Sequence, residues 1–109
     1  MPGPTVESLE KLIGTPRDGS LLRYSLGLEY SKLSEWGKAV EHLQKSVESD
    51  PGYSAAWRAL GKALEAEERS AEALEAYRSG ITAAQKKGDK QAEKEMTVFA
   101  RRIEKKAAG

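Results

Sequence analysis

Apolar residues recur along the chain in stripes of helical spacing, and polar breaks separate one stripe from the next. The first pair of stripes lies between Ser20 and Tyr53 and consists of Leu22, Leu26, Tyr30 and Leu33, then Trp36, Ala39, Val40, Leu43 and Val47. Intervals of mostly three and four residues place these side chains on one face of each helix. Pro51 lacks the N–H that a continuing helix would need. The pattern predicts two helices joined by a short turn, a helical hairpin.

The segment from Ser54 to Lys87 repeats this pattern with an offset of 34 residues. The offset superposes Leu26-Gly27 on Leu60-Gly61, Ala39 on Ala73, and Leu43 on Tyr77. A fixed period of this length is typical of repeat proteins, in which each hairpin buries its apolar face against its neighbours. A glycine costs about 1 kcal/mol inside a helix, so Gly27 and Gly61 are best explained by close contact between two helices. We therefore expect two stacked hairpins.

One further apolar stripe lies on each side of the two hairpins. The first consists of Val6, Leu9, Leu12 and Ile13, and the second of Ala92, Met96, Phe99 and Ile103. Thr5 is expected to cap the N-terminal helix and Gly14 to end it. With Gln85 in place of a closing proline, the preceding helix is expected to continue through Lys87 to Gly88, and Asp89 to cap the last helix.

The predicted fold is therefore all-α, a short solenoid of two helical hairpins with an N-terminal helix and a C-terminal capping helix. Two hairpins alone would leave apolar faces uncovered, and the flanking helices supply the cover. We expect a single domain with four parts: an N-terminal helix and loop over residues 1–19, repeat 1 over 20–53, repeat 2 over 54–87, and the capping helix over 88–109.

The repeats resemble the tetratricopeptide-repeat (TPR) family, whose motif runs Trp-x2-Leu-Gly-x2-Tyr and then Ala, an aromatic residue, Ala and Pro. The corresponding residues are Arg23, Leu26, Gly27, Tyr30, Ala39, Leu43, Ser46 and Pro51 in repeat 1, and Trp57, Leu60, Gly61, Leu64, Ala73, Tyr77, Gly80 and Gln85 in repeat 2. The likeness is greatest to small stand-alone bacterial TPR proteins. It implies a module that binds a protein or peptide and has no enzymatic activity.

The resemblance also implies a binding surface, because the first helix of each hairpin lines the concave face of such a solenoid. By the family's geometry this face carries Leu21, Tyr24, Leu28, Ser31 and Lys32 from repeat 1, Ala55, Arg58, Lys62 and Glu65 from repeat 2, and Glu93, Thr97 and Arg101 from the capping helix. Leu21, Tyr24 and Leu28, here called the apolar strip, lie beside Arg58 and Lys62. This combination indicates a site for an extended or helical peptide with an acidic group.

Two observations limit this interpretation. The N-terminal helix, or the loop over residues 15–19, could fold over the apolar strip and cover it. Some family members grip a terminal carboxylate with one Lys and two Asn, but Tyr24, Leu28 and Ala59 stand at those positions in this sequence. A carboxylate clamp of that kind is therefore not expected.

Composition narrows the function classes further. The chain has no cysteine and one histidine, His42, which we expect to be an exposed or rim residue, so neither a metal site nor a paired nucleophile and base is predicted. We expect no cofactor. Trp36 and Trp57 fall on the core stripes and are expected to be buried.

Two alternative functions and a cellular location are also predicted. The formal net charge is +1, and residues 86–106 hold eight Lys and Arg against four acidic residues. Weak nucleic-acid binding through this basic C-terminal helix is one alternative function, disfavoured because the cations alternate with glutamates. Self-association into a homodimer is another. The N-terminus lacks a basic start and an apolar run, so we expect a cytoplasmic protein without membrane contact.

Overall fold

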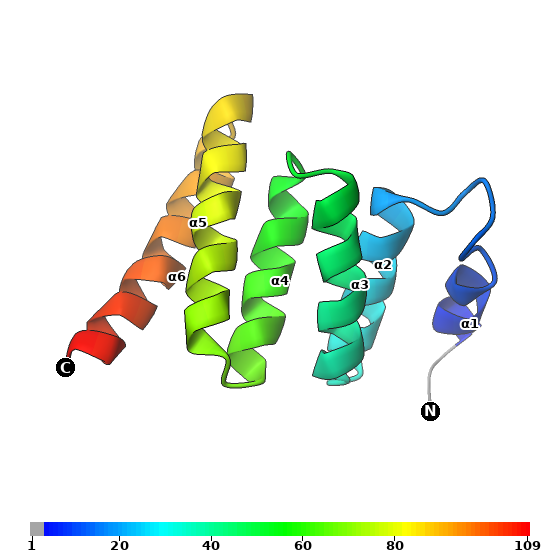
Figure 1. Cartoon of the computed structure of the whole chain (residues 1–109), viewed down its shortest axis with the longest axis horizontal. Coiled ribbons are helices and arrows are strands. Elements are labelled where there is room, and N and C mark those ends of the chain that lie inside the picture. Colours follow the sequence, from blue (N-terminus) through cyan, green and yellow to red (C-terminus); the bar gives the residue numbers. More distant parts are fainter. Residues whose placement is uncertain (1–3) are drawn as a thin grey trace.

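The computed structural model describes residues 4–109, and these residues form helices and connecting turns with no strand. The helices are α1 (Pro4–Glu10), α2 (Ser20–Lys32), α3 (Trp36–Ser49), α4 (Ser54–Ala66), α5 (Ser70–Lys87) and α6 (Lys90–Ala108). They follow one another in space in their order along the chain, with the two termini at opposite ends of the array (Figure 1). The predicted all-α fold is confirmed.

The helices after α1 form two layers. Helices α2 and α3 pack as one hairpin and α4 and α5 as the next, while α3 packs on α4 and α5 packs on α6. Helix α4 also contacts both α2 and α6, whereas no comparable contact joins α3 to α5 within the described residues. Figure 1 accordingly draws α2 and α6 behind α3 and α5. Because the helices of the α2–α4–α6 layer approach one another more closely, this layer forms the concave side.

Large side chains fill the space between the layers where glycines let helices meet. Leu43 and Tyr77 are fully buried, and each lies against a glycine of the preceding helix. A Cβ atom added to Gly61 would lie 2.6 Å from Cδ1 and Cζ of the Tyr77 ring, and one added to Gly27 would overlap Leu43. The predicted packing role of both glycines is therefore confirmed, and the same small-to-large pairing joins the two helices of each hairpin.

The C-terminal boundaries are also as predicted. Helix α5 ends at Lys87, and Gly88 follows in the left-handed conformation with φ 73°. Asp89 caps α6, since its carboxylate accepts a hydrogen bond of 3.1 Å from the Ala92 N–H. Such a cap satisfies one of the backbone donors that the first turn of a helix leaves unpaired.

The expected N-terminal helix is shorter than the apolar stripe suggested. Helix α1 ends at Glu10, and Thr5 lies inside it rather than at its cap. Beyond Glu10 the chain tightens into turns, in which the Ile13 N–H bonds to the Glu10 carbonyl at 3.1 Å. Gly14 then adopts a positive φ of 79°, and its N–H donates to Asp18 at 2.9 Å. These turns direct the chain into the loop before α2.

Helix α1 nevertheless covers part of repeat 1. Val6 is buried with 3% of its surface exposed, and Leu9 and Leu12 pack against the core.

In the part of the chain that the structure describes, none of the helices combines the length and apolar character that crossing a bilayer requires.

Candidate protein-binding surface

The apolar strip lies on α2 beside the helix's buried face. Leu21 is 68% exposed, whereas Tyr24 and Leu28 are half-buried. The intervals of three and four residues between them place all three on one face of α2. Tyr24 packs on Tyr53, from the turn before α4, with ring centroids 4.8 Å apart. The strip therefore combines one largely exposed leucine with an aromatic pair that the core holds in place.

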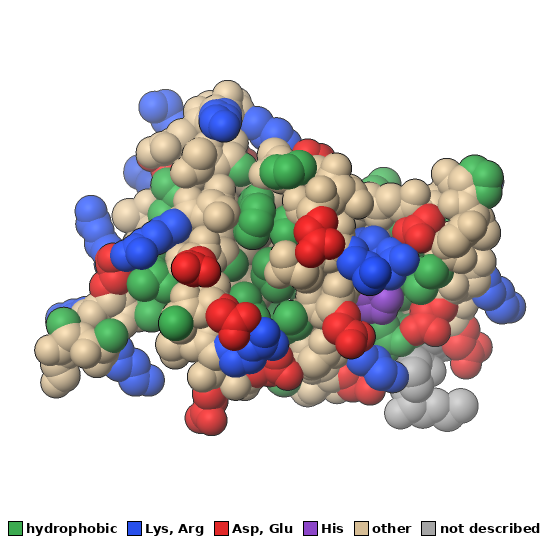
Figure 2. All heavy atoms as spheres, viewed as in Figure 1, with side chains coloured by type: hydrophobic (Ala, Val, Ile, Leu, Met, Phe, Trp, Pro, Cys, Tyr) green, Lys and Arg blue, Asp and Glu red, His purple; other side chains and the backbone are tan. Residues whose placement is uncertain are grey.

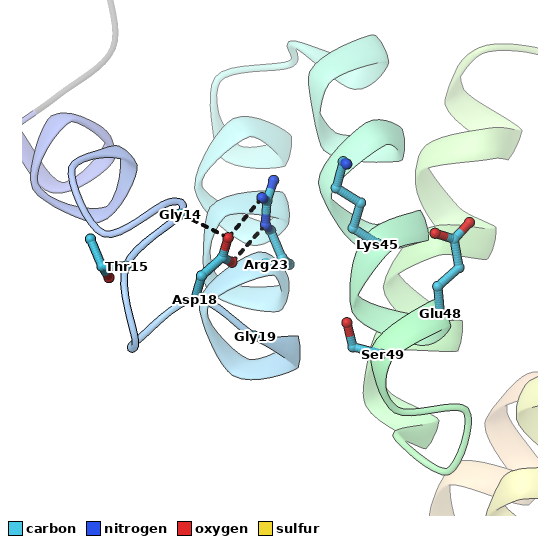
Figure 3. Close-up of a pocket in the computed structure, with 8 residues that line it drawn as sticks. All are labelled: Gly14, Thr15, Asp18, Gly19, Arg23, Lys45, Glu48 and Ser49. Atoms are coloured by element: carbon cyan, nitrogen blue, oxygen red, sulfur yellow. Dashed lines mark hydrogen bonds and ion pairs between the residues drawn. The ribbon is translucent and has the colours of Figure 1, made fainter.

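The N-terminal segment attaches to a different side of α2. Its loop is held through Asp18, whose carboxylate accepts hydrogen bonds from Arg23 Nε at 2.9 Å and Nη2 at 3.0 Å (Figure 3). Arg23 stands two residues from Leu21, which is roughly 200° around the helix axis. The loop is bound to Arg23, on a different side of α2 from Leu21, and Leu21 stays largely exposed. The loop therefore leaves the Leu21 end of the strip open.

The remaining candidates on α2 and at the ends of α4 differ in their exposure and in the partners that they contact. Ser31 and Ala55 are half-buried. Lys32 is exposed and forms an ion pair of 2.9 Å with Glu29 of its own helix. The exposed Glu65 accepts a hydrogen bond of 2.5 Å from the buried Tyr77 hydroxyl, and burial, followed by this bond, raises the pKa of Tyr77. Glu65 thus stabilises the core as well as facing solvent.

Arg58 and Lys62 are directed toward α6 and not toward the apolar strip. Arg58 Nη1 lies 2.6 Å from the Glu95 carboxylate, and Lys62 Nζ lies 4.0 Å from the centre of the Phe99 ring. Both contacts join α4 to α6 within the concave layer. The structure therefore places these two cations against α6. The apolar strip on α2 and the two cations are thus further apart on the concave layer than the sequence suggested.

Two of the candidates from the capping helix make hydrogen bonds within the α5–α6 pair. The Glu93 carboxylate accepts a hydrogen bond from Gln85 of α5 at 3.1 Å, and the Thr97 hydroxyl donates to the backbone carbonyl of Glu93. The predicted set did not include Val98 of α6, which is 46% exposed. Val98 is the ninth residue of α6, as Leu28 is of α2 and Lys62 of α4, so the helix start at Lys90 was the signal that could have identified it.

A second group of polar residues lies on the other side of repeat 1. Arg23 Nη1 is 3.2 Å from His42 Nδ1, and the His42 ring stacks on Tyr30 at 5.6 Å. A guanidinium only donates hydrogen bonds, so Nδ1 accepts and the imidazole is neutral. Burial, followed by the Arg23 charge, lowers the pKa of His42. Figure 2 shows the single histidine of the chain beside Lys and Arg side chains. His42 is half-buried, so of the two expected placements it matches a rim residue and not a fully exposed one.

The same group holds the N-terminal loop in place. Hydrogen bonds from Arg23 and from the Gly14 N–H hold the pKa of Asp18 at about 2. Lys45, Glu48 and Ser49 of α3 line the opposite side of the hollow that these residues enclose (Figure 3). Asp18 and Arg23 satisfy each other, so the geometry indicates a structural contact between loop and repeat.

The two tryptophans are less buried than predicted. Both are half-buried. Trp57 Nε1 donates a hydrogen bond of 2.7 Å to the Pro51 carbonyl, which keeps the indole edge near the surface. Within residues 4–109, no group of three or more His, Cys, Asp or Glu side chains is arranged to hold a metal ion.

Comparison with known proteins gives consistent matches to one family. A family model described as tetratricopeptide repeat matches residues 24–88. The chain is 47% identical over 100 residues to the TPR repeat-containing protein PA0015 of Pseudomonas aeruginosa, covering 92% of this chain and 95% of that protein. The solution structure of protein BPP2914 from Bordetella parapertussis is similar with a TM-score of 0.81 and 39% identity, covering 97% and 92% of the two chains. A tetratricopeptide repeat domain protein from Salinibacter ruber gives a TM-score of 0.74 and 29% identity, covering 82% and 89%.

Proposed function

Since the chain belongs to the tetratricopeptide-repeat family, we propose that it binds a segment of another protein on its concave face. Proteins of this family generally mediate protein–protein interactions and act as scaffolds rather than as enzymes. Their stacked hairpins present an extended concave surface to a partner. In this chain α2, α4 and α6 provide that surface.

The observation that carries the proposal is the exposure of the apolar strip. Leu21 is 68% exposed although its neighbour Leu22 is buried, so the core of repeat 1 does not use the Leu21 side chain. Burying such a leucine against a partner contributes up to about 2 kcal/mol. Tyr24, held against Tyr53, adds a rigid aromatic surface of the kind enriched at protein interfaces.

The test uses random peptides displayed on phage and selected on the immobilised chain. Peptides that are recovered are synthesised, and their affinities are measured by fluorescence anisotropy against the wild-type chain and Leu21→Ser. We expect Leu21→Ser to weaken binding about tenfold, which corresponds to roughly 1.4 kcal/mol of lost contact.

Leu33→Ser is the matched control, because Leu33 is a partly exposed leucine that follows α2 at its other end, outside the apolar strip. It is expected to leave affinity unchanged, and thermal unfolding checks that both variants are folded. If no peptide is recovered, or if Leu21→Ser binds as well as Leu33→Ser does, the proposal is rejected.

Self-association and nucleic-acid binding remain competing predictions that the same protein sample can test. Burial of the strip between two copies predicts concentration-dependent sedimentation that Leu21→Ser abolishes. Nucleic-acid binding through α6 predicts affinity that falls steeply with salt concentration. Either result in the absence of peptide binding would favour the competing function.

A further inference from the structure

We infer that α6 forms one end of the binding surface and that the partner is an acidic segment with an apolar anchor. The inference rests on the proposed function and names the chemistry of its ligand. It follows from three features of the concave layer: the equivalent positions of its helices, the pairing of its charges, and the order in which apolar and basic side chains follow one another.

The first feature is the register of α6. Lys94, Val98 and Arg101 are the fifth, ninth and twelfth residues of α6. In α2 and α4 the same places are held by residues that were predicted to bind a partner: Tyr24, Leu28 and Ser31, and Arg58, Lys62 and Glu65. Helices of one layer that pack in succession present equivalent positions on the same face. The surface therefore continues from α4 onto α6, where Val98 is 46% exposed.

The second feature is an excess of positive charge at this end. The Glu95 carboxylate already neutralises Arg58. In contrast, Lys62, Lys94 and Arg101 have no ion-pair partner within 4.0 Å among residues 4–109. The Lys62 ammonium is instead over the Phe99 ring. Electrostatic complementarity favours a partner whose carboxylates meet these three cations.

The third feature is the order of side chains along the layer. The apolar strip lies on α2, and the unpaired cations lie on α4 and α6, with Val98 among them. A partner segment that crosses the layer therefore meets apolar side chains at the N-terminal end of the solenoid and basic ones at the C-terminal end. The matching segment carries Leu-like or aromatic residues at one end and Asp or Glu at the other.

The experiment compares charge variants on the peptides recovered by selection. Lys94→Glu/Arg101→Glu reverses two charges on α6, and Lys86→Glu reverses one on α5, outside the concave layer, as a control. We expect the recovered peptides to be rich in Asp and Glu and their affinity to fall with salt concentration. The double variant should weaken binding roughly tenfold, whereas Lys86→Glu should not.

Each outcome has a separate meaning. Peptides that require Leu21 but carry no acidic excess, and that bind the double variant normally, overturn the inference and leave the proposed function standing. Acidic peptides that are insensitive to Leu21→Ser overturn the apolar anchor. Recovery of no peptide rejects both. A single-stranded oligonucleotide probe that binds more tightly than any peptide, and is lost in the double variant, shows that the cations serve nucleic acid and also overturns the inference.

Discussion

Replacing Gly61 with alanine tests the packing that defines repeat 2. Alanine has the higher helix propensity, and in an unconstrained helix interior the change would stabilise by about 1 kcal/mol. Here the added Cβ would lie 2.6 Å from Cδ1 and Cζ of the Tyr77 ring. That distance is far below a normal carbon–carbon contact, so either α4 must move away from α5 or the ring must move.

The surroundings of Tyr77 oppose both movements. Its ring is fully buried, lies 5.4 Å from the Phe99 ring, and is held by the hydroxyl bond to Glu65. Overpacking of a rigid core site costs about 1–3 kcal/mol, and more where an aromatic ring is displaced. After subtracting the gain in propensity, we expect Gly61→Ala to lower the free energy of unfolding by about 2 kcal/mol, or the melting temperature by roughly 10 °C.

The assay is urea unfolding followed by circular dichroism, with Gly37→Ala as control. Gly37 is exposed near the start of α3, and a Cβ there would meet nothing closer than 3.4 Å. Gly37→Ala should therefore be neutral or slightly stabilising. Tyr77→Leu, which removes part of the ring, should reduce the penalty of Gly61→Ala by about 1 kcal/mol in a double-mutant cycle. Equal stability of Gly61→Ala and Gly37→Ala would refute the reasoning.

Three further predictions concern the cap of α6 and the polar group of repeat 1. Asp89→Ala should lower the free energy of unfolding by about 1 kcal/mol in the same urea assay, because it removes the cap, and no change would contradict the capping role. The pKa of Asp18 is lowered from 3.8 to about 2 by Arg23 and the Gly14 N–H, so its stabilising contribution is present above about pH 4 and is lost between pH 4 and 2. Asp18→Asn should remove that part of the acid unfolding curve. The pKa of His42 is lowered from 6.5, so stability should fall as pH drops below 6.5, and His42→Gln should flatten this dependence.

The helices of the repeats could be predicted because their cause is local and repeated. Gly27 and Leu43 stand sixteen residues apart, as do Gly61 and Tyr77, and each pair meets inside one hairpin. The end of α1 could not be predicted in this way. It is accompanied by polar turn bonds, such as the bond from the Gly14 N–H to Asp18 four residues further on, and the apolar spacing of residues 6–13 does not reflect such polar bonds.

The face that each candidate side chain occupies was also predictable in part, whereas its partner was not. Helical spacing grouped Leu21, Tyr24 and Leu28 on one side of α2. The contact from Arg58 to Glu95 spans 37 residues, and nothing in the spacing of either helix indicates it. The half-buried position of His42 has a similar origin, because its contacts with Arg23 and Tyr30 come from α2 and not from its own helix.

The ion pair of Arg58 bears directly on how a partner could use the basic end of the surface. Arg58 and Glu95 keep 37% and 35% of their side-chain surfaces exposed, and ion pairs with this access to water contribute at most about 1 kcal/mol. A partner carboxylate could therefore take the place of Glu95 at small cost, since the guanidinium would exchange one acidic group for another. The Glu95 carboxylate, already 35% exposed, would then face water, so the exchange leaves no charge buried and unpaired. The pair thus holds α4 and α6 together in the free chain and still allows Arg58 to join Lys62, Lys94 and Arg101 when an acidic segment binds.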